Sequence, residues 1–118
     1  MRRAPDPDTF LPLTHLVYHL LLALAESPAH PYGLVQRIRT QSDGRVDPGT
    51  GSFYSIIRRT VDDGLIVETD AEAGADQRRR MYDISPLGRR VLEAEVRRLE
   101  TQLTATRRLL KATERRGR

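Results

Sequence analysis

The chain is organised around the stretch PGTGSFYSIIRRTVDDGLIVE, residues 48–68. Within it, apolar side chains recur at the three- and four-residue spacing of a helix, and a short apolar run follows at once. The helical stripe consists of Phe53, Ile56, Ile57, Thr60 and Val61, and the apolar run consists of Leu65, Ile66 and Val67. Either Thr50 or Ser52 can cap the first turn, and Gly64 supplies the positive φ that ends many helices. The stretch therefore predicts a helix over residues 52–63 that leads directly into a strand.

The polar face of this helix carries side chains that suit a DNA reader. Arginine offers paired donors to guanine, and hydroxyl groups bond phosphate oxygens. We expect base-edge contacts from Ser52, Ser55 and Arg59, and phosphate contacts from Tyr54 and Arg58. An ordinary amphipathic helix with a solvated polar face has the same periodicity. The order of the elements around the helix has to decide between these two interpretations.

The spacing of apolar residues and the positions of proline and glycine predict the helices, strands and turns in the rest of the chain. The expected elements are a helix from Thr14, its cap, to Glu26, a helix over 32–40, a very short strand around Val46, strands at 65–69 and 80–84, and a helix from Pro86 to Thr113 capped by Ser85. In the second helix, Leu34, Val35 and Ile38 should face inward, while Arg37 and Arg39 face outward. The order helix, helix, helix, strand, loop, strand, helix is that of a winged helix-turn-helix domain.

The predicted fold class is mainly α with a small β-hairpin, that is, a winged helix-turn-helix with a long C-terminal dimerisation helix. We divide the chain into a flexible arm at residues 1–9, a DNA-binding domain at 10–85, and a dimerisation helix with a basic tail at 86–118. At 118 residues the chain can hold one small domain, near the size at which association often adds stability.

The basic residues are clustered. Residues 1–85 carry a net charge of −2, whereas residues 86–118 carry +6, and 19 of the 20 basic residues are arginine. Because the planar fork of arginine matches phosphate and guanine, this composition favours an anionic partner such as double-stranded DNA. The triplet Arg78, Arg79 and Arg80 lies where the hairpin tip becomes its return strand, and it suits contact with the DNA backbone or a narrow minor groove. A solvated charge run, offset by Asp70, Glu72 and Asp76, is the competing interpretation.

The last helix carries an apolar seam. Its members alternate at spacings of four and three: Leu92, Val96, Leu99, Leu103, Thr106 and Leu110. About three heptads of so narrow a stripe need a second surface to bury them. We therefore predict a homodimer in which this helix meets a partner helix through Leu92, Val96, Leu99, Leu103 and Leu110.

Several other chemistries find no support in the sequence. There is no cysteine, no nucleophile beside a base, and no phosphate-cradling loop that follows a strand, so we predict no enzyme activity and no cofactor. His15 and His19 have a metal-binding spacing but lack a third ligand, so no metal site is predicted. No apolar run reaches the length of a membrane span and no stretch resembles a signal peptide, so we expect a soluble cytoplasmic protein without membrane contact.

Three segments together resemble the PadR family of bacterial winged helix-turn-helix transcription regulators. They are LLALAESPAHPYGLVQRI at 21–38, PGTGSFYSIIRRTVDDGLI at 48–66 and RRRMYDISPLGRRVLEAE at 78–95. The single C-terminal helix is similar to the smaller type within the family.

The resemblance implies a homodimeric repressor that releases operator DNA when an effector of unknown identity binds. It also implies that Tyr32 and Tyr54 lie near phosphates, that Ser52 takes the place of the motif's Thr, and that Arg78 to Arg80 form the basic wing. Phe53 stands where the family motif has Leu. A winged-helix adaptor that binds protein instead of DNA is the alternative from another class.

Overall fold

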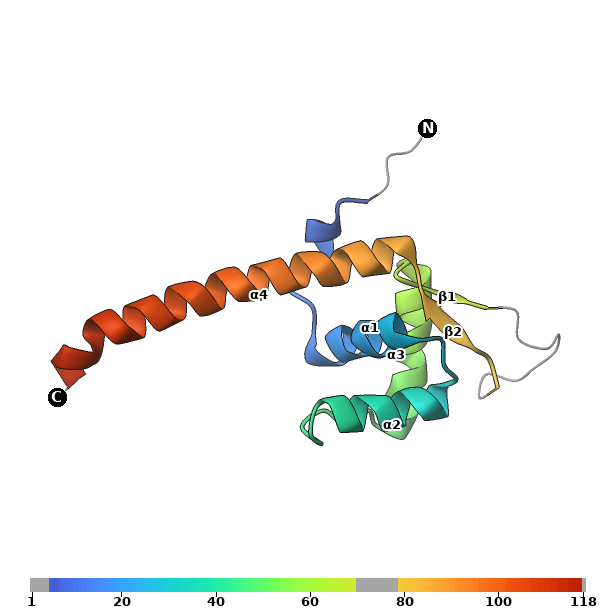
Figure 1. Cartoon of the computed structure of the whole chain (residues 1–118). Helices are drawn as coiled ribbons and strands as arrows, with labels where there is room; N and C mark the ends of the chain where they lie inside the picture. The colour runs from blue at the N-terminus through green and yellow to red at the C-terminus, as the bar shows by residue number, and fades with distance from the viewer. Residues whose placement is uncertain (1–4, 70–78, 118) are drawn as a thin grey trace.

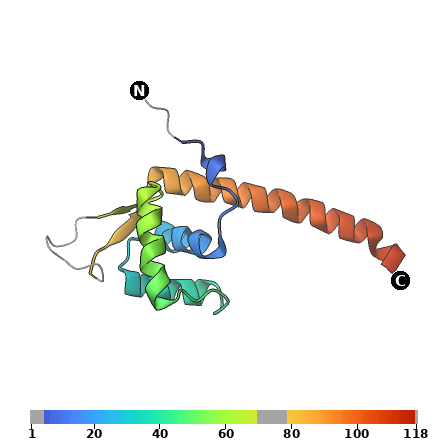
Figure 2. The same cartoon turned by 180° about the vertical axis from the view of Figure 1, so that it is seen from behind.

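The structure is a computed structural model that describes residues 5–69 and 79–117. In chain order, its elements are η1 (Pro7–Phe10), α1 (His15–Glu26), α2 (Pro31–Gln41), α3 (Thr50–Asp62), β1 (Ile66–Glu68), β2 (Tyr82–Ile84), α4 (Pro86–Thr113) and η2 (Glu114–Gly117). Helices α1 to α3 and the hairpin gather at one end of the molecule, and α4 crosses this group and then projects away from it (Figures 1 and 2). The predicted fold class, mainly α with a β-hairpin and a long C-terminal helix, is confirmed.

The core lies between α1, α2 and α3. Leu20, Leu21 and Leu24 of α1 are buried together with Phe53 and Ile57 of α3, as the helical stripes predicted. Further buried residues of this core are Leu34 and Ile38 of α2, Leu65 and Ile66 at β1, Tyr82 of β2, and Val91 and Leu92 of α4. The domain core therefore includes the first turns of the C-terminal helix.

The polar residue Thr60 belongs to the buried side of α3. Only 3% of it is exposed, and its Oγ1 donates a hydrogen bond of 2.6 Å to the carbonyl oxygen of Ile56. Because a buried hydroxyl is costly only when it lacks a partner, Thr60 can occupy a position in the apolar stripe.

Two local predictions around the start of α3 are wrong. Val46 does not form a strand. Its amide donates a hydrogen bond to Ser42 Oγ at 3.0 Å, and its carbonyl oxygen accepts one from the same hydroxyl at 3.2 Å. These bonds turn the chain back onto the end of α2. The N-cap of α3 is Gly49, without a side-chain cap bond, and not Thr50 or Ser52. Ser52 lies inside the first turn, where it is too far along the helix to be its cap. At the other end, Gly64 has the predicted positive φ, 79°.

The hairpin pairs β1 and β2 in antiparallel register, with Ile66 opposite Ile84 and Glu68 opposite Tyr82. It is also fastened to the turn between α1 and α2. The amide of Ala29 donates to the carbonyl oxygen of Tyr82 at 3.0 Å, and the amide of Tyr82 donates back at 2.9 Å. This bridge holds the hairpin against the helices.

The junction before α4 is tightly packed. Ser85, the predicted cap, accepts a hydrogen bond from the Gly88 amide at 2.9 Å and donates to the carbonyl oxygen of Gly64 at 2.6 Å. A Cβ atom on Gly88 would lie 1.9 Å from the carbonyl oxygen of Leu65. The glycine therefore allows α4 to approach the chain where α3 ends and β1 begins.

The segment before α1 packs along α4. Its 3₁₀ helix, Pro7–Phe10, lies mostly within residues 1–9, the predicted arm, and contacts α4. The amide of Leu13 donates to Oε2 of Glu95 at 2.7 Å, and the Nε of Arg98 donates to the other carboxylate oxygen. Glu95 thus links this segment to α4.

Candidate nucleic-acid interface

Three elements converge on one end of the domain: the start of α2, the recognition-helix candidate α3, and the hairpin (Figure 1). The bridge between Ala29 and Tyr82 joins the turn before α2 to β2. Next to it, Nδ1 of His30 lies 3.1 Å from the carbonyl oxygen of Arg80. These contacts place the base of the hairpin beside the first turn of α2.

Helix α3 presents its predicted polar face to solvent. Ser52, Ser55, Arg58 and Arg59 are exposed, and Tyr54 is half-buried. Phe53 and Ile57 on the opposite face anchor the helix in the core. Rigid support of one face and free access to the other is the arrangement that groove insertion requires.

Arg58 and Arg59 leave this face on different flanks, because successive residues in a helix are about 100° apart. Arg59 lines a groove of about 380 Å³ together with Phe10 of the segment before α1, Val17 of α1 and neighbouring residues of α3. Burial raises the pKa of the Tyr82 phenol in the hairpin, and the positive charge of Arg58 acts against this rise. The two adjacent arginines therefore have different surroundings.

The first turn of α2 contributes Tyr32. This residue is 75% exposed, which is unusual for a large aromatic residue, and Pro31 before it is buried. The phenol can donate to a phosphate oxygen without any rearrangement of the core. Its exposure is consistent with the predicted phosphate contact.

The wing arginines are only partly described. Arg78 lies outside the described residues, and Arg79 is exposed. Arg80 makes an ion pair with Glu68, with 3.1 Å between Nε and Oε1. Glu68 is not among the predicted interface residues, because its place opposite Tyr82 follows only from the hairpin register.

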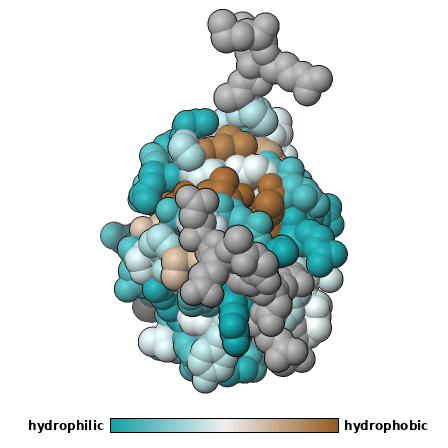
Figure 3. Space-filling view, turned by 90° about the vertical axis from the view of Figure 1, so that its right-hand side faces the viewer, coloured by the Kyte–Doolittle hydropathy of each residue, from teal (hydrophilic) through white to brown (hydrophobic). Residues whose placement is uncertain are grey.

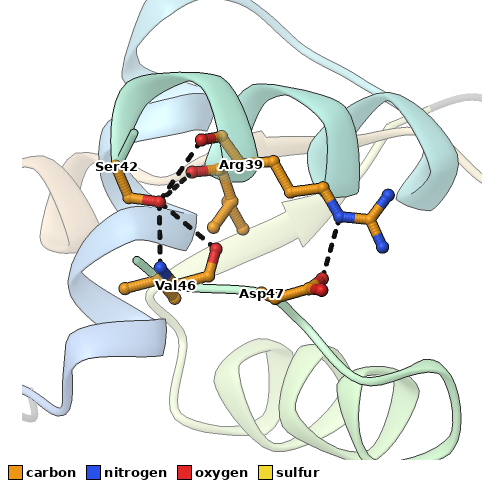
Figure 4. A network of polar contacts seen from close by, with 5 residues as sticks. Arg39, Ser42, Val46 and Asp47 are labelled. Atoms are coloured by element: carbon orange, nitrogen blue, oxygen red, sulfur yellow. Dashed lines mark hydrogen bonds and ion pairs between the residues drawn. The ribbon is translucent and has the colours of Figure 1, made fainter. Parts of the chain in front are cut away.

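The turn between α2 and α3 is held by side chains of α2 (Figure 4). Arg39 Nε lies 2.8 Å from Asp47 Oδ1, and the Ser42 hydroxyl lies 2.7 Å from the carbonyl oxygen of Ile38. Together with the Ser42 contacts to Val46, they determine where α3 starts relative to α2. Arg39 faces outward as predicted, and it is paired within the domain.

Arg37 does not face outward, so this prediction is wrong. Its guanidinium donates to the carbonyl oxygens of Ala23 and Ser27 at 3.0 and 2.6 Å, and to the Ser27 hydroxyl at 2.8 Å. The carbonyl groups at the end of a helix lack partners within it, and a cation there also opposes the helix dipole. Arg37 therefore binds the carbonyl groups at the C-terminus of α1.

The seam residues of α4 divide into two groups. Leu92 is 9% exposed and belongs to the domain core, although it was predicted to face a partner helix. Val96, Leu99, Leu103 and Leu110 lie beyond the core, with 39%, 39%, 48% and 66% of their surface exposed. Leu109 adds a further exposed apolar side chain, 59% accessible, that the heptad pattern did not include.

The face that carries the hairpin is mostly hydrophilic and has a smaller apolar patch in its upper part (Figure 3). Within residues 5–69 and 79–117, no group of three His, Cys, Asp or Glu side chains could hold a metal ion. His15 and His19 therefore gain no third ligand there. No helix in the same ranges is long and apolar enough to cross a membrane.

These features define a winged helix-turn-helix protein of the transcription-regulator class. The model of the transcriptional regulator PadR-like family matches residues 20–94, and the chain belongs to that family. The resemblance stated from the sequence is thereby confirmed. No curated protein matches the sequence.

Solved structures share the fold. A transcriptional regulator from Clostridium thermocellum is 20% identical and has a TM-score of 0.66, with 89% of this chain and 97% of that chain covered. A PadR family transcription regulator from Clostridium difficile R20291 is 14% identical, with a TM-score of 0.67 and coverages of 82% and 99%. A PadR-like transcription factor from Bacteroides fragilis is 22% identical, with a TM-score of 0.62 and coverages of 80% and 88%.

Proposed function

We propose that this PadR-family regulator is a repressor that binds a pseudo-palindromic operator as a homodimer. The observation that carries the proposal is the convergence of Tyr32, the polar face of α3 and Arg80 on one end of the domain. Each of these elements adds donors for phosphate or base edges, and the core holds α3 in place behind them. The binding residues on α3 are Ser52, Tyr54, Ser55, Arg58 and Arg59, and Arg78 and Arg79 extend the hairpin's contribution.

The homodimer follows from the exposed half of α4. The molecule measures 63 × 41 × 22 Å, because this helix continues well past the domain. Val96, Leu99, Leu103 and Leu110 expose an apolar stripe there that the chain itself does not cover. A second copy of the helix supplies the matching surface, and the two-fold arrangement then presents two copies of α3 to successive major grooves.

Release by an effector belongs to the same proposal, and its support is the family alone. Neither α4 nor η2 contains an aromatic residue, so a flat aromatic ligand has no ring to stack against along this helix. The alternative is a winged-helix adaptor that binds another protein and does not recognise DNA.

The test is a fluorescence anisotropy titration with the intergenic DNA upstream of the protein's own gene and with a scrambled duplex of equal length. We expect tighter binding to the first duplex and a linear fall of log affinity with log salt, with a slope of about −0.9 for each neutralised phosphate. Equal and salt-independent binding to both duplexes would favour the adaptor. The spacing of protected half-sites should be about 10 base pairs or a multiple of it.

A further inference from the structure

Glu68 is a carboxylate on the otherwise cationic side of the hairpin. It is the last residue of β1 and lies opposite Tyr82. Arg80 precedes the first residue of β2 by two positions, and its side chain reaches Glu68 across the hairpin. The Nε of Arg80 is 3.1 Å from Oε1 of Glu68, with side-chain exposures of 48% and 43%. The pair is therefore open to solvent and to any ligand that approaches the hairpin.

The pKa of the Tyr82 phenol depends on the charged side chains around it. Burial raises the pKa of its phenol, and the negative charge of Glu68 raises it further, whereas Arg80 and Arg58 act in the opposite direction. Glu68, Arg80 and Arg58 are thus all close to one buried ring. Two of them are residues proposed to bind phosphate, and the third is an anion placed beside them.

We propose that Glu68 is a positioning residue that acts as an internal counter-ion of Arg80 and weakens the binding of DNA of any sequence. An exposed ion pair is weak in water, so a phosphate can replace the carboxylate at Arg80. Breaking the ion pair costs part of the free energy that the contact between Arg80 and phosphate contributes. Glu68 therefore lowers the affinity through Arg80. The inference rests on the proposed function.

The contacts of the Arg80 backbone strengthen this assignment. Its carbonyl oxygen is bound by His30 Nδ1, and Tyr82 two residues later is bridged to Ala29. The backbone of Arg80 is therefore held, and its side chain both pairs with Glu68 and hydrogen-bonds the Tyr82 side chain. In the described part of the chain, Glu68 is the anion that it meets.

The experiment compares Glu68→Gln, which removes the charge and keeps the shape, with the unchanged chain on upstream and scrambled duplexes. We expect an affinity gain of about three- to tenfold on both duplexes and a salt slope that is steeper by about 0.9, the value for one more neutralised phosphate. Glu68→Asp, which retains the charge, should stay within twofold of the unchanged chain. The gain should disappear when Arg80→Gln is added, because the carboxylate acts through Arg80.

Asp83→Asn is the matched control, since it changes the net charge by the same amount on the other face of the hairpin. An equal gain in this control, a gain that persists with Arg80→Gln, or an unchanged affinity in Glu68→Gln would each overturn the inference while leaving DNA binding intact. Absence of salt-dependent binding by the unchanged chain would reject the proposed function and this inference together.

Discussion

Glu95 is the one carboxylate among the described residues that is both buried and paired. Only 2% of it is exposed, and it accepts hydrogen bonds from Arg98 and from the Leu13 amide. Burial by itself would raise the pKa of the Glu95 carboxyl, but the bonds from Arg98 and Leu13 outweigh it, and the pKa lies below its usual value. A lowered pKa in the folded state means that the ionised carboxylate stabilises the fold at neutral pH, and that this contribution is lost as the pH falls through the folded-state pKa.

We therefore predict that Glu95→Gln destabilises the protein at neutral pH by about 2 kcal/mol, the cost of weakening a buried charge-assisted pair. The difference from the unchanged chain should begin to shrink as the pH falls below the ordinary glutamate pKa of about 4.3, and it should be lost below the folded-state pKa, where the carboxyl is protonated in both folded and unfolded chains. Urea unfolding at several pH values measures both effects. The exposed neighbour Glu93 provides the control, and a Glu93→Gln variant with the same loss would contradict the assignment.

The two arginines in the middle of α3 should differ in what they contribute. Arg59→Ala is predicted to reduce discrimination at one base pair by about 1–3 kcal/mol, because a paired arginine–guanine contact is lost. Arg58→Ala, on the hairpin side, should weaken operator and scrambled DNA by similar factors, as loss of a phosphate contact does. Anisotropy titrations against single-base variants of the operator separate the two patterns. Equal loss on every duplex for both variants would show that neither residue reads bases.

At the scale of elements, the decisive contact is the one between α4 and the chain that links α3 to β1. Gly88 permits it, since a Cβ there would lie 1.9 Å from the carbonyl oxygen of Leu65. We predict that Gly88→Ala destabilises the fold by about 3 kcal/mol or more, because backbone has to move to relieve the overlap. Gly51 is also in a helix, but nothing lies within 4 Å of its Cβ position. Gly51→Ala should therefore leave stability unchanged or raise it by up to about 1 kcal/mol in the same urea unfolding experiment.

At the scale of the whole molecule, α4 contributes to the domain core with its first turns and carries the exposed apolar stripe on its later turns. Its first turns bury Val91 and Leu92 in the domain, so removing the helix after Gly88 would also remove part of the core. Point substitutions further along separate folding from association. They leave the buried residues in place and change only the exposed stripe.

We predict that Leu103→Glu dissociates the dimer, since it places a charge in the apolar seam between two helices. Sedimentation equilibrium should show the mass fall from twice the chain mass of 13.4 kDa to that of one chain, with helical content retained. Thr101→Glu, on an exposed position of the same helix outside the seam, is the control. An unchanged dimer mass in Leu103→Glu would contradict the proposed interface.

The sequence by itself determined helices α1 to α4, the two hairpin strands and their order, but it also predicted a strand around Val46 that does not form. Helix bounds followed from apolar stripes and from caps such as Thr14 and Ser85, because these signals act within one turn of the chain. The polar face of α3 and the exposed leucines of α4 followed from the same periodicity. The family was also recognisable at this level, since its motifs are local.

Only the tertiary structure decided which polar side chains meet across elements. Arg37 donates a hydrogen bond to the carbonyl oxygen of Ser27 at the end of α1. Glu95 accepts a hydrogen bond from the Leu13 amide before α1, and Glu68 forms an ion pair with Arg80. Each of these contacts joins separate elements, and periodicity along one element says nothing about the distance to another. The stretch 48–68 was predicted as a helix that leads into a strand. Its two arginines acquired different surroundings only in the folded domain, where Arg59 lines a groove with Phe10 and the charge of Arg58 acts on Tyr82 of the hairpin.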